Sequence, residues 1–286
     1  MGHLTRYLGN LHRNSYHCLF LLLIIVFAIG SAERARGAAA VKQKTFSSPE
    51  EGVKALIDAA RKNDMKGILE ILGADAKSII ESGDPVADNE GRERFVKSYD
   101  ESNKLVKSGD SKAVLEVGKD EWPFPIPLVK ENAGWRFDTQ EGKEELLNRR
   151  KGRNELDVIQ VSLAIVDAER EYYQRDPDGD KLLQYAQKLI STKGKRDGLY
   201  WETKPNEQPS PLGSLVAQAR AEGYKAASGK PVPYHGYYYN LLTGQGKDAP
   251  GDAYDYLVRG KMIGGFGVVA YPAQYGSSGI MTFIVN

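Results

Sequence analysis

The sequence predicts an α+β protein: N-terminal helices with a small antiparallel sheet, then one long helix packed on a four-stranded antiparallel sheet. The main observation is the segment 154–173, where apolar residues recur at steps of three and four along two adjacent stripes. This pattern is typical of a helix of about five turns with more than half of its circumference apolar. Alternating residues between turn signals over 234–285 indicate strands that can bury both stripes.

Three helices are expected before any strand. Ser48 is the expected N-cap of the first helix, with a proline directly after it and Glu51 as the capping-box partner. Asp64 is expected to cap the second helix, and the third is expected over 90–103. Residues 82–85 indicate a turn between the second and the third helix.

A small antiparallel sheet is expected after these helices. Residues 113–117 alternate like a strand, and the apolar residues on either side of 131–134 indicate a hairpin. The proline-rich segment 122–127 is excluded from the interior of a sheet, because proline lacks the backbone donor. With a further helix over 140–150, this order predicts an N-terminal α+β domain over 46–150.

The C-terminal domain is expected over 151–286, because Lys151-Gly152 separates the helix before it from the long helix. A shorter helix is expected over 181–190, and another from Ser210 to Gly223. The four expected strands cover 234–242, 253–258, 262–270 and 279–285. One long helix across this sheet is the simplest way to bury both apolar stripes.

Residues 1–40 are typical of an export signal, with basic residues before the unbroken apolar run 19–29. Small residues permit cleavage after Ala32 or Ala40, and the alternative is an uncleaved N-terminal anchor. Cys18 is the only cysteine and precedes the apolar run, so the mature chain has no disulfide. We therefore expect a periplasmic or secreted protein that meets the membrane only through its signal segment.

The charges of the chain are balanced and exclude one class of partner. The 39 Lys and Arg residues against 38 Asp and Glu residues give a net charge of +1. Nucleic-acid binding needs a basic excess that neutralises phosphates, so no nucleic-acid partner is expected.

Seven segments resemble one bacterial family of exported proteins of unknown function, domain of unknown function family 2950. They cover nearly the whole mature chain in the family order: SPEEGVKALIDAAR, SGDPVADNEGRERF, GKDEWPFPIPLVKENAGWRFDT, GRNELDVIQVSLAIVDAEREY, KRDGLYW, PYHGYYY and GGFGVVAYPAQYGSSGIMTF. The resemblance implies export, but no established activity, substrate or catalytic residues. Family members usually continue past Asn286 into a last short strand, so the resemblance implies an exposed edge at 281–285 in this chain.

Two further resemblances concern architecture alone. The N-terminal order of helices and sheet looks like the cone-shaped fold of the nuclear-transport-factor-2-like (NTF2-like) superfamily. The C-terminal half is similar to type IV pilin and pseudopilin head domains, which place such a helix across a small antiparallel sheet. A shared architecture does not establish filament assembly.

The acidic loop after the long helix is the clearest candidate for a metal site. Asp176, Asp178 and Asp180 stand at alternate positions, as in the first half of an EF-hand loop. The next EF-hand position is Lys181 and the twelfth is Gln187, where glycine and glutamate are required. The sequence therefore favours a solvated acidic turn, with weak calcium binding as the alternative and no other cofactor expected.

His235 is the only histidine outside the signal segment, at the start of an expected strand. General-base catalysis would pair it with a carboxylate such as Asp197 or Asp255, and Ser277 or Ser278 could act as nucleophile. The serines lack the G-x-S-x-G turn that precedes a helix. A structural histidine at a strand end is the favoured interpretation, and a zinc site would need further His or Cys ligands.

Aromatic residues suggest a surface that could bind a glycan or a peptide. The candidates are Trp122, Trp135, Tyr200, Trp201, Tyr237, Tyr238 and Tyr239. Strand alternation sends Tyr237 and Tyr239 to one face and Tyr238 to the other, so at least one set is expected in a core.

These observations favour an exported cell-envelope protein that acts as a non-enzymatic binding or scaffold module. No convincing catalytic set is present, and the expected partner is an envelope protein or glycan. The alternative is a hydrolase of envelope material that uses His235 with Asp197 or Asp255. A pocket that holds His235 and two carboxylates within hydrogen-bond reach would favour the enzyme, and a flat aromatic or edge-strand surface would favour binding.

Overall fold

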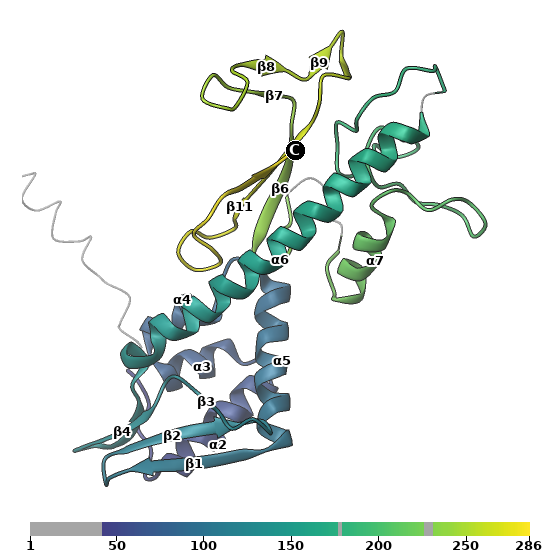
Figure 1. Cartoon of the computed structure of the whole chain (residues 1–286). Coiled ribbons are helices and arrows are strands. Elements are labelled where there is room, and N and C mark those ends of the chain that lie inside the picture. Colours follow the sequence, from purple (N-terminus) through teal and green to yellow (C-terminus); the bar gives the residue numbers. More distant parts are fainter. Residues whose placement is uncertain (1–41, 177–178, 226–230) are drawn as a thin grey trace, which may run out of the picture. The chain divides into compact units, whose positions relative to one another are not determined.

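The computed structural model describes residues 42–176, 179–225 and 231–286, so the expected signal segment lies outside the described residues. Helices and antiparallel sheets are both present, which confirms the α+β class (Figure 1). The residues from Gln43 to Asn286 form one compact unit. None of the described helices is long and apolar enough to cross a membrane.

The N-terminal helices begin at side chains that cap them. They are α2 (Pro49–Arg61), α3 (Met65–Leu72), the 3-10 turn η1 (Ala74–Ala76), α4 (Lys77–Ile80) and α5 (Pro85–Glu101). Ser48 Oγ accepts the Glu51 N–H at 3.2 Å, and Asp64 caps α3 in the same way, as predicted. The helix expected over 90–103 begins earlier, as α5 at Pro85 directly after the expected turn, because Asp84 accepts two backbone N–H groups of its first turn.

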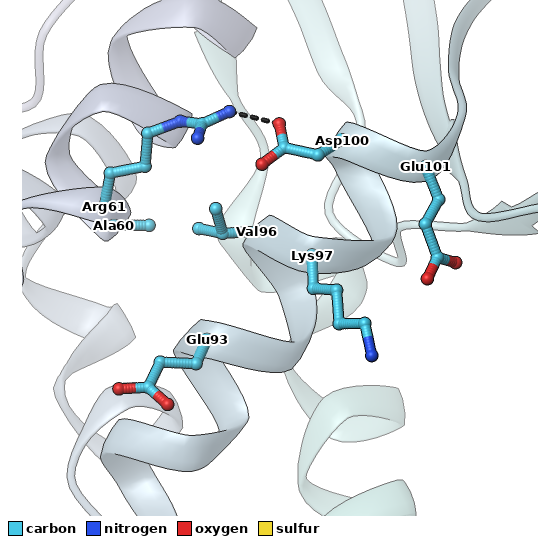
Figure 2. Close-up of a pocket in the computed structure, with 7 residues that line it drawn as sticks. All are labelled: Ala60, Arg61, Glu93, Val96, Lys97, Asp100 and Glu101. Atoms are coloured by element: carbon cyan, nitrogen blue, oxygen red, sulfur yellow. Dashed lines mark hydrogen bonds and ion pairs between the residues drawn. The ribbon is translucent and has the colours of Figure 1, made fainter.

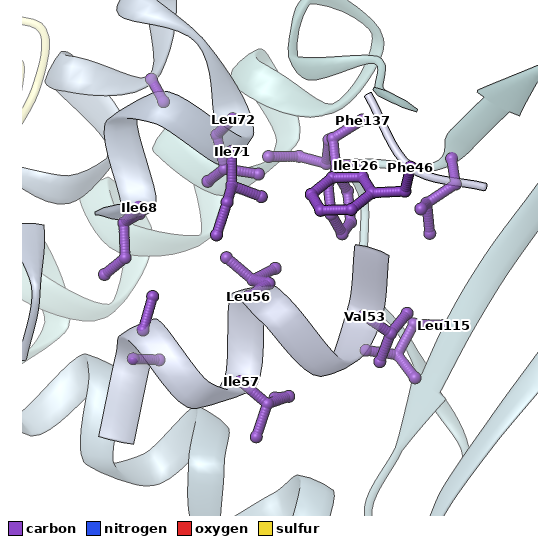
Figure 3. Packing of buried hydrophobic residues seen from close by; sticks show 14 of the residues in the cluster. Phe46, Val53, Leu56, Ile57, Ile68, Ile71, Leu72, Leu115, Ile126 and Phe137 are labelled. Atoms are coloured by element: carbon purple, nitrogen blue, oxygen red, sulfur yellow. The ribbon is translucent and has the colours of Figure 1, made fainter. Parts of the chain in front are cut away.

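A sheet of five antiparallel strands follows, with β3 pairing β2 beside the path β1-β2-β4-β5. The strands are β1 (Asn103–Ser108), β2 (Lys112–Val117), β3 (Trp122–Pro123), β4 (Leu128–Glu131) and β5 (Gly134–Phe137). The hairpin of β4 and β5 was predicted, but β1 was not. Figure 3 shows Leu56 of α2 facing Ile71 and Leu72 of α3, with Ile126 and Phe137 beside them in the N-terminal core.

The long helix α6 runs without a break from Thr139 to Arg175, so the expected interruption at Lys151-Gly152 is wrong. Gly152 costs a helix about 1 kcal/mol relative to alanine, which is too little to end one. One cluster of buried apolar residues precedes α6 and another surrounds its second half. The division into domains over 46–150 and 151–286 stays a prediction, with its boundary inside a continuous helix.

Only one of the two apolar stripes of α6 is covered throughout. Ile165 is 2% exposed and packs in the C-terminal core with Val161, as predicted. Leu156, Ile159 and Leu163 on the other stripe are 67%, 40% and 49% exposed, which contradicts the expected burial of that stripe. The sheet beneath α6 is too small to cover both faces.

The C-terminal sheet has three strands in the order β12-β11-β6, not the four that were predicted. These strands are β6 (Tyr237–Leu242), β11 (Gly267–Pro272) and β12 (Phe283–Val285). Two separate two-stranded ladders use the remaining segments: β7 (Gly244–Gln245) with β8 (Tyr254–Asp255), and β9 (Leu257–Val258) with β10 (Lys261–Met262). The left-handed φ of 140° at Gly265 divides the expected strand 262–270. β12 lies at an edge of the sheet, as expected.

Two helices were expected in the segment between α6 and β6, and only the second is present. The expected helix over 181–190 is absent, because the backbone N–H of Tyr185 donates to Met262 O at 2.8 Å and pairs with β10 instead. The helix expected from Ser210 to Gly223 is confirmed as the shorter α7 (Gly213–Ala221).

Candidate functional site

His235 lies in a tight turn that leads into β6. Its φ of 50° and the φ of 76° at Gly236 are both left-handed, as the two central residues of a type I′ turn require. The side chain is 20% exposed, with Nδ1 3.8 Å from Asp157 Oδ2 and Nε2 3.5 Å from Glu222 Oε2. The carboxylates beside His235 are therefore not those that the sequence suggested.

The two acids expected to assist His235 stabilise local turns. Asp197 accepts hydrogen bonds from Lys188 Nζ at 2.8 Å and from a backbone N–H at 2.7 Å. The Lys188 ammonium holds the pKa of Asp197 far below its usual range. Asp255 accepts a backbone N–H two residues along the chain at 2.9 Å. Neither acid forms an ion pair with His235, so the structure does not bring this expected set together.

The two serines considered as nucleophiles also have structural partners. Ser277 Oγ donates to the carbonyl oxygen of Ser78 at 3.0 Å. Ser278 Oγ donates to Gln274 O at 3.1 Å and accepts the Gln274 N–H at 2.9 Å. Neither hydroxyl is hydrogen-bonded to His235 in the described part of the chain. No activated nucleophile adjoins the imidazole there.

The acidic loop lies partly outside the described residues, since Asp178 is not among them. Asp176 Oδ2 accepts the backbone N–H of Lys181 at 3.0 Å. Asp180 forms an ion pair with Lys261 and accepts a backbone N–H at 2.9 Å. Within the described ranges, no group of three or more His, Cys, Asp or Glu side chains is arranged to hold a metal ion. Calcium binding stays a prediction.

Asp84 joins the start of α5 to the turn that contains His235. Its carboxylate is 1% exposed, and Oδ2 accepts from Tyr224 Oη at 3.0 Å and from the Gly236 N–H at 2.8 Å. Oδ1 caps α5. Four donors to one buried carboxylate satisfy its charge. This network is structural and positions the His235 turn against the N-terminal part of the unit.

A cavity lies between α5, the first half of α6 and the proline-rich segment 122–126. Its volume is about 640 Å³. Its apolar lining comes from Leu56, Ile68, Leu72, Ile79, Ile80, Phe95, Val117, Phe124, Ile126 and Leu146. Phe95 and Phe124 lie with their ring centroids 5.0 Å apart, so an aromatic pair forms part of the wall. Trp122, which is 57% exposed, also lines the cavity and marks its opening to solvent.

The charged residues of the lining are five arginines and one acid. The arginines are Arg92 and Arg94 of α5 and Arg149, Arg150 and Arg153 of α6, and the acid is Asp88 of α5. Arg149 lies over the Trp122 ring, 5.6 Å from its centroid, at the opening. Arg150 donates to the carbonyl oxygens of Ser78 and Ile79, and its nearest carboxylate oxygen, on Asp88, is 3.9 Å away.

Burial and like charge both act on the cavity arginines. Burial lowers the pKa of Arg150, and the nearby guanidinium groups of Arg153 and Arg92 lower it further. Partial burial lowers the pKa of Arg153 and the charge of Arg94 lowers it further, whereas Asp157 acts in the opposite direction; the residue as a whole is exposed to solvent. Burial raises the pKa of Asp88. The opposite charges of Asp88 beside Arg150 and of Asp157 beside Arg153 offset these effects only in part.

The helix α5 leaves room for this cavity because none of its residues is buried. Gly91 lines the cavity, and a Cβ built on it would meet only Arg94 Nη2, at 3.9 Å. A glycine inside a helix is unfavourable by about 1 kcal/mol relative to alanine, so keeping Gly91 free of a side chain costs α5 some stability.

The sequence reasoning missed the cavity, although one signal for it is visible. The run Arg149-Arg150-Lys151-Gly152-Arg153 is strongly basic in a chain of net charge +1. The apolar lining of the cavity gives no such signal, because residues that line a cavity have the same composition as residues in a filled core.

A second, shallower pocket of about 440 Å³ lies on the other side of α5. Figure 2 shows Arg61 of α2 reaching toward Asp100 of α5, with which it forms an ion pair. Glu93, Lys97 and Glu101 also line this pocket and carry both signs of charge. Its charged groups are exposed to solvent and of both signs, so they would bind a ligand more weakly than the groups of the arginine-lined cavity.

A family model described as "Protein of unknown function (DUF2950)" matches residues 43–286. No curated protein and no solved structure matches the chain.

Proposed function

The chain belongs to the DUF2950 family of proteins of unknown function, and we propose that it is a non-enzymatic protein that binds a small molecule in the cavity between α5 and α6. One observation carries the proposal: an apolar cavity of about 640 Å³ that opens beside an exposed tryptophan. Small-molecule sites typically measure about 300–1,000 Å³ and combine apolar walls with a few polar groups. The cavity has both properties.

Binding has more support than the hydrolase alternative. A hydrolase would need His235 within reach of a nucleophile or a water-activating acid. The neighbouring carboxylates, on Asp157 and Glu222, lie 3.8 Å and 3.5 Å from its ring nitrogens, beyond ordinary hydrogen-bond length. The cavity lining does not include His235. A scaffold role with an envelope protein or glycan as partner stays a prediction.

We also propose that binding takes place outside the cytoplasm, in the periplasm or after secretion. The support is the basic segment and apolar run before residue 33. N-terminal sequencing of the exported protein is expected to begin near Glu33 or Val41. A membrane-bound product that still carries residues 1–32 would contradict cleavage and leave the uncleaved anchor.

Gly91 allows the binding proposal to be tested from inside the cavity. Calorimetric titrations of the purified protein with decanoate and with 1-decanol measure whether an apolar chain binds. Gly91→Trp places a large side chain in the cavity and is expected to abolish binding of any probe that the wild type binds. Gly91→Ala adds a single methyl group with open space around it and is the matched control, with binding close to that of the wild type.

The controls separate occlusion from unfolding. Circular dichroism and the thermal midpoint establish that Gly91→Trp is folded, and Ser98→Trp, from the same helix and the same lining, fills the cavity independently. Loss of binding in both folded tryptophan variants, with binding retained in Gly91→Ala, is the expected result. Equal binding in all variants, or no binding of either probe by the wild type, would overturn the proposal.

A further inference from the structure

The arginines in the cavity indicate the chemical class of its ligand, an inference that rests on the binding function proposed above. We propose that the ligand is an amphiphile with one apolar chain or ring body and an anionic head group, a carboxylate, sulfonate or phosphate. Its body occupies the apolar walls formed by residues such as Phe95 and Phe124. Its head group is held by the guanidinium groups of Arg150 and Arg153.

The cavity arginines differ in how far their charges are already compensated. Arg94 pairs with Glu90 at 3.2 Å and Arg149 pairs with Glu145 at 2.6 Å, each within one helical turn. Arg153 has no carboxylate of the described residues within ion-pair distance. Asp157, on the same helix, acts on it from farther away, so the charge of Arg153 is compensated only in part and stays accessible to a ligand.

Arg150 is oriented for the same purpose. Backbone carbonyls of Ser78 and Ile79 and the hydroxyl of Ser277 accept from its guanidinium group, which fixes the direction of the side chain. These neutral acceptors hold the group in place without neutralising it. A planar guanidinium presents several donors in a fixed plane, which suits two-point binding of a carboxylate or a phosphate.

Asp88 is the acid that competes with a bound anion. Its Oδ2 accepts the Ser82 N–H at 2.8 Å, and its Oδ1 is 3.9 Å from Arg150. The charged groups that act on it are Arg150 of α6 and Arg92 of α5. Because burial favours the neutral form of this carboxyl group, an incoming anion meets reduced competition.

Other ligand classes fit the cavity less well. A cation would add to charges that already repel one another, and a neutral chain would leave the charges of Arg150 and Arg153 only partly compensated. A polyanion such as nucleic acid needs an extended basic surface, whereas the whole chain has a net charge of +1. A single anionic group on an apolar body matches both the walls and the head-group region.

Three probes of equal chain length test the head group: decanoate, 1-decanol and decylammonium, each titrated into the purified protein by calorimetry. Decanoate is expected to bind at least about tenfold more tightly than 1-decanol, the ratio that one charge-assisted hydrogen bond provides. Decylammonium is expected to bind more weakly than either. Decyl sulfate, which stays ionised throughout the usable pH range, should follow decanoate.

The variants assign the selectivity to particular side chains. Arg153→Gln should reduce decanoate affinity about tenfold and leave 1-decanol affinity unchanged, because it removes charge and not apolar surface. Arg170→Gln is the matched control on the same helix, since Arg170 is 66% exposed, pairs with Asp167 and does not line the cavity. Asp88→Asn, which keeps an oxygen for the Ser82 N–H, should bind decyl sulfate more tightly than the wild type.

The outcomes separate this inference from the proposed function. If 1-decanol binds as tightly as decanoate and Gly91→Trp blocks both, the anionic head group is refuted and the binding function stands. If decanoate is preferred but Arg153→Gln and Arg150→Gln both retain the preference, the arginine assignment is refuted. If none of the probes binds the wild type, the binding function itself is refuted.

Discussion

Glu169 is the buried carboxyl group from which we expect the largest effect of pH on stability. It lies on α6 with 0% of its surface exposed, and Oε2 accepts the Ala186 N–H at 2.8 Å. Oε1 has no hydrogen-bond partner among the described residues. Burial raises the pKa of Glu169 from 4.5 to about 8. The folded protein therefore keeps this proton at pH values where the unfolded chain has released it.

The sign and size of the effect follow from this difference in pKa. The folded pKa lies above the unfolded value, so the stabilisation is complete below pH 4.5 and is lost as the pH rises toward 8. Each pH unit in this window corresponds to about 1.4 kcal/mol, so the free energy of unfolding falls by about 3 kcal/mol between pH 4.5 and 7. Glu169→Gln carries no charge and keeps an oxygen for the Ala186 N–H. Its stability should lack this decline.

Urea unfolding followed by circular dichroism at pH 5, 6, 7 and 8 tests this expectation. The stability of Glu169→Gln relative to the wild type should rise by about 1.4 kcal/mol per pH unit between pH 5 and 7 and less steeply toward pH 8, the folded pKa. Asp167→Asn is the matched control, since Asp167 is on the same helix with 79% of its side chain exposed, and its difference from the wild type should stay nearly constant. A difference between Glu169→Gln and the wild type that does not change with pH would refute the reasoning.

Three other predictions address the core, the Asp84 network and the acidic loop. Ile165→Asp should destabilise the protein by about 4 kcal/mol or more, because it buries an unpaired charge in the C-terminal core, and an unchanged thermal midpoint would mean that α6 does not pack there. Asp84→Ala should lower the free energy of unfolding in urea by at least about 3 kcal/mol, since Tyr224 and other buried donors lose their acceptor, whereas a loss under 1 kcal/mol would show that water replaces the carboxylate. Calorimetric titration should detect at most weak calcium binding, in the roughly millimolar range, in the wild type and less in Asp178→Ala. Equal heats of titration in the wild type and in Asp178→Ala would mean that the loop is only a solvated acidic turn and does not bind calcium.

Several elements could be predicted because their signals are local. Ser48 and Asp64 were identified as N-caps because a short polar side chain before an amphipathic segment stabilises the backbone within one turn. The buried stripe of α6 followed from the spacing of its apolar residues, which depends only on the helical period. The start of α5 was missed, although Asp84-Pro85 carries the usual signal for an N-cap followed by a first-turn proline.

The candidate site could be predicted only in part. The basic run 149–153 is visible in the sequence, but its distance from Asp88 of α5 is not. His235 was singled out as the one histidine after the expected signal segment, and its neighbours Asp157 and Glu222 come from other segments than the acids expected to assist it. Local spacing carries no information on which carboxylate an imidazole will meet across the fold.

Local signals along the chain were sufficient to predict the α+β class, the family, the starts of α2 and α3 and the buried face of α6, because these depend on caps, on residue periodicity and on resemblance. They could not show that α6 is continuous through Gly152, that the C-terminal sheet has three strands, or that α5 and α6 enclose an apolar space lined by arginines. A helix break, a strand pairing and a cavity each depend on what packs against a segment. A glycine ends a helix only if packing does not compensate for its cost of about 1 kcal/mol, and apolar residues enclose a cavity only if nothing fills the space between them.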